Sequence, residues 1–183
     1  MAPSNASKET SVVDLRSLIR DIPDFPKPGI LFRDVTPLLG NGPAFRACIM
    51  QMCERLAPYK PQAIAGIESR GFLFGATVAV ELGIGFVPIR KPGKLPWKTR
   101  KEAYALEYGT DAVEVHQDAV SPGTRVALLD DLLATGGTAG AAIRLLQGLG
   151  GQVVVAEFLI ELAFLKGRAA LGAVPTEVLI SYA

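Results

Sequence analysis

Apolar side chains follow a helical spacing in two places near the start of this chain. They recur every three or four positions over residues 11–22, where Ser11 can serve as the N-cap, and this spacing predicts a helix. Three prolines then force an irregular segment, after which residues 30–34 are expected to be extended. A second helix is expected from Pro43 to about Leu56, because proline is favoured in the first turn and apolar residues again share one face.

From residue 63 onward, short apolar runs alternate with helical stretches. The runs predict strands over residues 63–67, 85–90, 126–129, 152–159 and 178–180, and the stretches predict helices over residues 71–82 and 138–149. Strands that alternate with helices predict an α/β fold, with a mostly parallel sheet flanked by helices.

About 35 residues without a helical period separate the second and third of these strands. Residues 105–108 and 112–115 are expected to form a hairpin there, with its turn at Gly109-Thr110-Asp111. A long insertion in a compact domain is usually functional or mobile.

The composition is ordinary for a folded chain of one domain. Apolar residues make up 49% of the 183 residues and charged residues 20%, and the net charge of +1 gives no overall attraction to nucleic acid or to an anionic membrane. The most apolar stretch, residues 153–165, contains two glutamates and is shorter than the roughly 20 residues that span a bilayer. No signal-peptide pattern is present, and the two cysteines, Cys48 and Cys53, are expected to pack as small core residues. We therefore expect a cytoplasmic protein that does not bind a membrane.

The stretch from Val126 to Thr138 carries the clearest chemical signal. An apolar strand is expected to end in two acids, Asp130 and Asp131, and a helix follows a loop of small residues, which are Ala134, Thr135, Gly136, Gly137 and Thr138. Ligands of open α/β sheets bind beyond the carboxyl ends of the strands, and a glycine-rich turn into a helix presents backbone N–H groups to an anion. The loop therefore suits a phosphate monoester, although it lacks the Lys-Ser/Thr of a Walker A loop.

Two carboxylates beside an anion site need a positive or hydroxylic neighbour. Ribose hydroxyls fit, because ionised carboxylates only accept hydrogen bonds, and so does a positive charge that develops on a sugar carbon. The alternative is a solvated acidic turn followed by a flexible loop.

The segment Val126–Thr138 resembles the signature with which type I phosphoribosyltransferases bind 5-phosphoribosyl 1-pyrophosphate (PRPP). Asp-Asp-Leu-Leu-Ala-Thr-Gly-Gly-Thr is similar to the branch of that family that acts on adenine, and further blocks agree over residues 25–34, 66–75, 87–96, 106–109 and 161–168. The resemblance covers about residues 11–180. It implies the type I fold in a single domain over residues 1–183, with a flexible tail over residues 1–10, a base-binding hood over residues 11–40 and a mobile loop and hairpin over residues 91–116.

The resemblance also implies a reaction. A glycosyltransferase of this kind, a pentosyltransferase of purine salvage, joins adenine to PRPP and releases AMP and pyrophosphate through an oxocarbenium-like transition state. Mg²⁺ is the implied cofactor, held mainly by substrate phosphates and water. The protein itself is expected to lack a dedicated metal site, since its only histidine, His116, has no second histidine or cysteine nearby with which to bind zinc.

By the same resemblance, the loop from Ala134 to Thr138 holds the 5′-phosphate, and Asp130 and Asp131, which are implied to be catalytic together with Glu107, hold the ribose hydroxyls. The implied pyrophosphate-binding residues form two sets, Glu68, Ser69 and Arg70, and Arg90, Lys91 and Lys94. The peptide bond between Glu68 and Ser69 is expected to be cis.

Catalysis and base recognition are implied for a third group of residues. Glu107 matches the catalytic acid near N7 of the purine. The implied base-binding residues are Leu31, Phe32, Arg33, Tyr108 and Leu162. As alternatives, Leu31, Phe32 and Leu162 could be core residues, and Glu107 could be an exposed acid of the hairpin.

Three other functions remain to be weighed. The first is transfer to a different base, against which the Leu31–Arg33 block and Glu107 argue. The second is a regulator that senses PRPP without turnover, although the chain keeps Arg70, Lys94 and Glu107. The third is nucleic-acid binding through residues 90–101, which contain six cations and no acid but only one aromatic residue, Trp97. We expect no nucleic-acid partner and, by resemblance, a homodimer.

Overall fold

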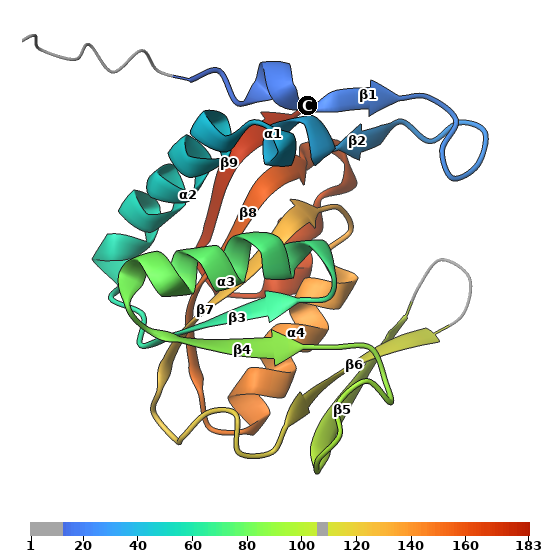
Figure 1. Cartoon of the computed structure of the whole chain (residues 1–183). Coiled ribbons are helices and arrows are strands. Elements are labelled where there is room, and N and C mark those ends of the chain that lie inside the picture. Colours follow the sequence, from blue (N-terminus) through green and yellow to red (C-terminus); the bar gives the residue numbers. More distant parts are fainter. Residues whose placement is uncertain (1–12, 106–109) are drawn as a thin grey trace, which may run out of the picture. The chain divides into compact units, whose positions relative to one another are not determined.

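The computed structural model describes residues 13–105 and 110–183 (Figure 1). Internal contacts divide the chain into two units, and the boundary falls between Cys48 and Ile49, inside helix α2 (Gly42–Leu56). Both cysteines are buried, as predicted.

The first unit contains a short hairpin rather than the predicted helix over residues 11–22. In the described part of that range, a 3₁₀ turn, η1 (Arg16–Leu18), is followed by strand β1 (Arg20–Ile22), which pairs antiparallel with β2 (Phe32–Asp34). The helical prediction was wrong because the backbone bonds to β2 outweigh the local apolar spacing. The extended segment predicted over residues 30–34 is confirmed in β2, and a short helix, α1 (Thr36–Gly40), follows it.

A tight loop between β1 and β2 makes this pairing possible. The Phe25–Pro26 peptide bond is cis, and Gly29 has a positive φ of 86°. The Gly29 N–H donates to Oδ1 of Asp24 at 2.7 Å, and the Phe25 N–H donates to the carbonyl of Ile30 at 3.2 Å. The prolines therefore shape a reversal of the chain, not merely the end of a helix.

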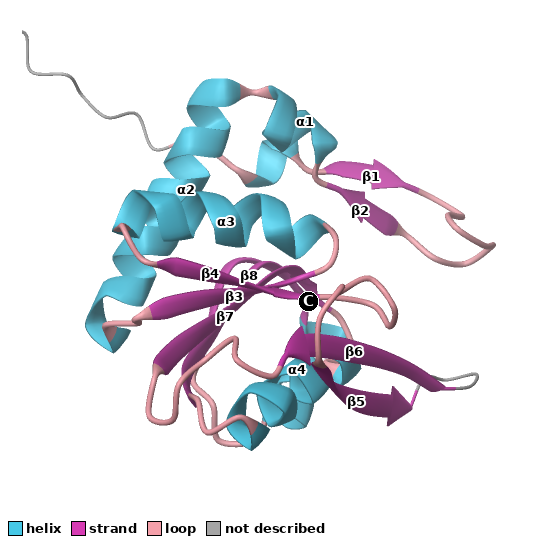
Figure 2. Cartoon of the chain, turned by 60° about the horizontal axis from the view of Figure 1, so that its bottom comes forward, coloured by secondary structure: helices cyan, strands magenta, loops and turns pink. Residues whose placement is uncertain are grey.

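The second unit is built on a parallel sheet of five strands, as predicted. The strand order is β4-β3-β7-β8-β9, and every neighbouring pair is parallel. The strands are β3 (Ala63–Ile67), β4 (Gly85–Ile89), β7 (Arg125–Leu133), β8 (Gln152–Leu162) and β9 (Thr176–Tyr182). Helix α3 (Arg70–Leu82) covers one face, and α4 (Gly137–Gly148) covers the other (Figure 2).

Three of these strands are longer than the sequence predicts, and β9 extends past its predicted range by two residues at each end. β7 continues to Leu133, so Asp130 and Asp131 lie inside the strand and not at its end. β8 continues to Leu162, which places Glu161 within the sheet. The extended parts of β7 and β8 pair with each other, since Asp130 pairs with Phe158 and Leu133 pairs with Glu161.

A second hairpin packs against α4. It consists of β5 (Thr99–Ala105) and β6 (Thr110–His116), which pair antiparallel (Figure 2). The hairpin is confirmed, but the turn predicted at Thr110-Asp111 is wrong, because both residues already belong to β6 and pair with Ala105 and Tyr104. Residues 106–109, which include most of one predicted strand, lie outside the described part of the chain.

Three 3₁₀ segments complete the second unit. They are η2 (Ala57–Tyr59), η3 (Ala163–Leu165) and η4 (Gly167–Leu171). Within the described residues, no helix is long and apolar enough to cross a membrane.

Glu157, in the middle of β8, is fully buried, and neither of its carboxylate oxygens has a hydrogen-bond partner. Its register neighbour on β9 is Glu177, which binds Arg55 and Tyr59. Burial raises the pKa of Glu157 to about 8, with Glu177 adding to the shift and Arg55 opposing it. At neutral pH this side chain therefore carries a proton.

We predict that Glu157→Gln makes the protein more resistant to unfolding at alkaline pH. A carboxyl whose pKa rises from 4.5 to about 8 on folding loses stability as pH rises through that window, by up to about 1.4 kcal/mol per pH unit. Thermal melts at pH 5 and pH 9 should show similar midpoints at pH 5 and a higher midpoint for the variant at pH 9.

Glu102→Gln is the control, because it removes a carboxylate that is paired with Arg144 and that is not among the groups that shift the pKa of Glu157. At pH 9 that variant should have no higher melting midpoint than the parent protein. Equal losses of stability between pH 5 and pH 9 in the parent protein and in Glu157→Gln would contradict the assignment.

Candidate functional site

The candidate site lies at the carboxyl edge of the sheet, where β3 ends and the neighbouring strand β7 runs on to Leu133. The connection from β3 runs through α3 to β4 on one side, whereas the connection from β7 runs through α4 to β8 on the other. Ligands of open parallel sheets bind at such a reversal of strand order. Both helices begin at this edge of the sheet, and helix N-termini favour negative charge.

The loop between β7 and α4 forms a small hollow. About 90 Å³ is lined by Asp130 and by residues 132–139. Gly136 precedes the helix with a φ of 79°, and its carbonyl accepts the Gly140 N–H at 2.8 Å. The first N–H groups of α4 have no acceptor within the helix, so the loop suits an anion of the size of a phosphate.

Asp130 lines this hollow, and Asp131 follows it in β7 without lining it. Asp131 is 4% exposed, and its Oδ2 lies 2.9 Å from Nε of Arg70, with which it forms an ion pair. The Asp131 N–H donates to Oδ1 of Asp130 at 2.9 Å. Burial raises the pKa of both carboxyls, most strongly for Asp130, where the charge of Asp131 adds to it, while Arg70 opposes the rise. Hydroxyl donors or a cation placed between them would favour their ionised forms.

Gly71 allows this arrangement, and the analysis of motifs alone did not single it out. A Cβ at this position would lie 2.7 Å from Oδ1 of Asp130 and 3.0 Å from the carbonyl oxygen of Leu129. The first turn of α3 therefore packs directly on β7, and only glycine leaves room for the carboxylate. A glycine directly after the predicted basic residue Arg70 is the sequence signal for this contact.

The loop after β3 has the predicted cis peptide between Glu68 and Ser69. The Glu68 carboxylate accepts hydrogen bonds from Nε and Nη2 of Arg90 at 3.1 and 2.9 Å and from the Lys91 N–H at 3.0 Å. Hydrogen bonds from Arg90 hold the pKa of Glu68 below its ordinary value. Glu68 thus fixes Arg90 beside the loop, while Ser69 is the N-cap residue of α3.

Lys91 is directed toward the hairpin. Its ammonium contacts Oδ2 of Asp111 and donates to the hydroxyl of Tyr104 at 3.1 Å. The same hydroxyl accepts the Thr138 hydroxyl at 3.0 Å and donates to Asp111 at 3.1 Å. This network joins Lys91, which is predicted to bind pyrophosphate, to Thr138. Thr138 is the last residue of the predicted phosphate-binding loop, residues 134–138, which is called the phosphate loop below. Sequence reasoning missed Tyr104 and Asp111, because their pairing across the hairpin has no local signal.

The remaining predicted residues are distributed over the chain. Lys94 is exposed, and its carbonyl accepts Nη1 of Arg90 at 3.0 Å. In the first unit, Leu31 is 44% exposed, Phe32 packs edge-to-face on Phe25, and Arg33 forms an ion pair with Asp21. Leu162 ends β8 in the second unit and is half-buried. The predicted residues Glu107 and Tyr108 lie outside the described part of the chain.

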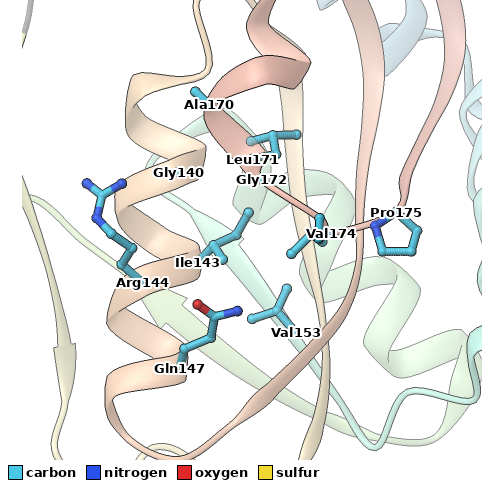
Figure 3. A pocket seen from close by; sticks show the side chains of 11 residues that line it. Gly140, Ile143, Arg144, Gln147, Val153, Ala170, Leu171, Gly172, Val174 and Pro175 are labelled. Atoms are coloured by element: carbon cyan, nitrogen blue, oxygen red, sulfur yellow. The ribbon is translucent and has the colours of Figure 1, made fainter.

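A larger groove of about 460 Å³ lies elsewhere. It lies between α4 and residues 170–175, with the side chains of Ile143 and Gln147 on that side of the helix, whereas the side chain of Arg144 extends away from residues 170–175 (Figure 3). Among the described residues, none that the sequence predicts to bind substrate lines it. The groove is therefore separate from the candidate site, despite its size.

Comparisons with known proteins show the family of the chain. A model of the phosphoribosyl transferase domain family matches residues 42–169. The chain is 56% identical over 170 residues to an adenine phosphoribosyltransferase of Rhodospirillum centenum, covering 93% of this chain and 99% of that relative. It is also similar to the crystal structure of adenine phosphoribosyltransferase from Thermoanaerobacter pseudethanolicus, with a TM-score of 0.91, 50% identity and coverage of 94% and 100% of the two chains.

A more distant similar structure is a complex with ligands. The Trypanosoma brucei adenine phosphoribosyl transferase, in complex with AMP, pyrophosphate and ribose-5-phosphate, matches with a TM-score of 0.84 and 29% identity, covering 96% of this chain and 81% of that one.

We predict that Gly71→Ala weakens the binding of ribose 5-phosphate by about tenfold or more. The added methyl must displace Asp130, and overpacking of this kind costs about 1–3 kcal/mol. Isothermal titration calorimetry measures the affinity. Gly85→Ala is the matched control, since a Cβ there meets nothing within 4 Å. An affinity for Gly71→Ala that equals that of the control would show that Asp130 does not depend on this contact.

Proposed function

The chain belongs to the phosphoribosyltransferase family, in its adenine phosphoribosyltransferase branch, and from that premise we propose how its own residues perform the reaction. The enzyme transfers the 5-phosphoribosyl group of PRPP to adenine and forms AMP and pyrophosphate. The single observation that carries the assignment of roles is the hollow in which a phosphate-sized loop, a helix N-terminus and Asp130 come together.

The loop from Ala134 to Thr138 binds the 5′-phosphate in this proposal. The positive φ of Gly136 turns the chain into α4, whose first N–H groups are free to bind an anion, and Thr135 and Thr138, which line the hollow, add hydroxyl donors. Thr138 exchanges its contact with Tyr104 for the phosphate, or shares it.

Asp130 and Asp131 bind the ribose hydroxyls. Their raised pKa values mean that they are poorly solvated in the absence of a partner, and two hydroxyl donors restore that solvation. Ionised carboxylates next to C1′ also stabilise the positive charge that develops there as the bond to pyrophosphate breaks.

Arg70, Arg90, Lys91 and Lys94 bind the pyrophosphate, positioned by Glu68 and Ser69. Glu68 holds the guanidinium of Arg90, which supports a fixed cation at the end of β4. Lys91 reaches the leaving group when it gives up its ion pair with Asp111 and its hydrogen bond to Tyr104. The cations stabilise the negative charge that accumulates on the departing pyrophosphate.

Mg²⁺ is the proposed cofactor. The donors at the site fit it, because Asp130 lines the hollow with hard carboxylate oxygen, which Mg²⁺ prefers, and accepts a hydrogen bond from the backbone N–H of Asp131. Substrate phosphates and water would supply most ligands, with Asp130 or Asp131 as the protein's contribution. When bound, the ion neutralises charge on the pyrophosphate.

Adenine is recognised by Leu31, Phe32, Arg33, Tyr108 and Leu162. The C1′–N9 bond forms as the C1′–O bond to pyrophosphate breaks, and adenine gives up one proton. Glu107, near N7, is the carboxyl that takes part in the transfer of this proton.

We also propose a homodimer. Leu73 and Val80 lie two turns apart on α3 and are 45% and 81% exposed, which supports an apolar surface for a second copy. Sedimentation at the mass of one chain at micromolar concentration would refute it. The cytoplasmic location stays a prediction from the sequence.

The primary test is AMP formation from adenine and PRPP. We expect turnover with Mg²⁺ and at least about a hundredfold less after chelation, since the leaving-group charge is then poorly compensated. Adenine, hypoxanthine and guanine at equal concentration should yield AMP almost alone. Preferred turnover of an oxo-purine would contradict the base assignment, and PRPP binding without turnover would favour a sensor.

A second test concerns Glu107. Glu107→Leu should lower kcat about 10²–10⁴-fold while the KM for adenine changes little, because a positioned carboxyl acts mainly in the transition state. Glu102→Gln is the control, because Glu102 is a hairpin acid that pairs with Arg144. Steady-state kinetics decide, and an unchanged kcat in Glu107→Leu would remove the proposed role.

A further inference from the structure

The segment η4 lies directly against the phosphate loop, backbone to backbone. A Cβ on Gly136 would overlap the carbonyl oxygen of Gly167, and a Cβ on Gly167 would overlap the carbonyl oxygen of Ala134. One turn further on, a Cβ on Gly140 would lie 2.6 Å from the carbonyl oxygen of Ala170. The loop therefore rests on Gly167 with no side chain between them, and a displacement of Gly167 displaces the loop.

The position of Gly167 is fixed by the residue that follows it. Nε and Nη2 of Arg168 donate to Oε1 and Oε2 of Glu161 at 2.6 and 2.9 Å, and Nη1 donates to the Thr176 carbonyl at 3.3 Å. The Ser181 hydroxyl lies 3.4 Å from Oε2 of Glu161. Paired charged hydrogen bonds of this kind fix direction as well as distance.

Glu161 is itself rigidly placed. It is 5% exposed near the end of β8, and it is the register partner of Leu133, the last residue before the phosphate loop. Hydrogen bonds from Arg168 keep the pKa of Glu161 below its ordinary value, so it stays ionised at neutral pH. One buried carboxylate thus links the strand beside the loop's first residue to the segment beneath the loop.

We propose that Glu161 and Arg168 are positioning residues for the 5′-phosphate loop and act through Gly167. The proposal rests on the proposed function of residues 134–138, since it concerns how that loop is held in a geometry that accepts phosphate. Neither side chain touches the substrate. Loss of the pair lets Gly167 shift, and the loop N–H groups then no longer converge on one point.

A competing role predicts a different kinetic effect. Leu162, a proposed base-binding residue, follows Glu161 directly in β8. If the pair served mainly to place Leu162, its loss would raise the KM for adenine. If the pair places the phosphate loop, its loss raises the KM for PRPP. It also weakens the binding of ribose 5-phosphate, a ligand that carries no base.

The test compares Glu161→Gln, Arg168→Met and Arg168→Lys with the parent enzyme. We expect about a tenfold rise in the KM for PRPP and a similar loss of ribose 5-phosphate affinity by calorimetry for the first two, with the KM for adenine within about twofold. Arg168→Lys keeps the charge but not the two-pronged geometry, so it should recover only part of the affinity.

Two further variants keep the result decisive. Gly167→Ala, whose methyl overlaps Ala134, should show the largest loss of phosphate affinity. Glu177→Gln breaks the carboxylate–arginine pair on the neighbouring strand and should leave both KM values unchanged. A loss shared by Glu177→Gln, a rise confined to the KM for adenine, or unchanged PRPP kinetics in Glu161→Gln and Arg168→Met would overturn the proposal.

Amide chemical shifts separate this inference from the function on which it rests. If ribose 5-phosphate fails to shift the amides of residues 134–138 in the parent protein, the proposed function fails and the positioning role fails with it. If those amides shift in the parent and shift equally at the same concentrations in Glu161→Gln and Arg168→Met, the positioning role alone is refuted.

Discussion

Two adjacent carboxylates of β7, the buried Asp131 and the half-buried Asp130, are kept partly out of water, and the rest of the site is arranged around that unfavourable desolvation. Arg70 offsets part of it from the first turn of α3. The N-termini of α3 and α4 add favourable dipoles at the same edge of the sheet. In the proposed function, the hydroxyls of a ribose donate to these carboxylates and a Mg²⁺ ion would add a positive charge beside them. Binding of the sugar would then offset the incomplete solvation of the two acids.

Close backbone packing makes this burial possible. Gly71 brings α3 onto β7 beside Asp130, and Gly136 and Gly167 bring the phosphate loop onto η4. Each contact excludes a side chain and leaves little room for movement, so the loop and the carboxylates keep a fixed relation. The hairpin adds an adjustable part, since Tyr104 and Asp111 bind Lys91 and Thr138 through hydrogen bonds that a phosphate can replace.

Local patterns predicted the parts of this molecule that are locally determined. The strands and helices of the parallel sheet, the glycine-rich turn and the acids beside it follow from spacing over a few residues. Elsewhere, pairing between segments that are distant in the sequence made predictions from local patterns wrong. Residues 13–22 do not form a helix because Ile22 pairs with Phe32, and β7 extends past Asp131 because Leu133 pairs with Glu161. The burial of Glu157 and the partners of Lys91 likewise depend on chain segments that sequence spacing does not relate.

A crystal structure with AMP bound tests the central claim most directly. The account predicts that the phosphate oxygens lie about 3 Å from the backbone nitrogens of residues 134–138, and that both ribose hydroxyls donate to Asp130 and Asp131. A nucleotide whose phosphate lies outside that loop, or whose ribose leaves both carboxylates without a hydroxyl partner, would contradict it.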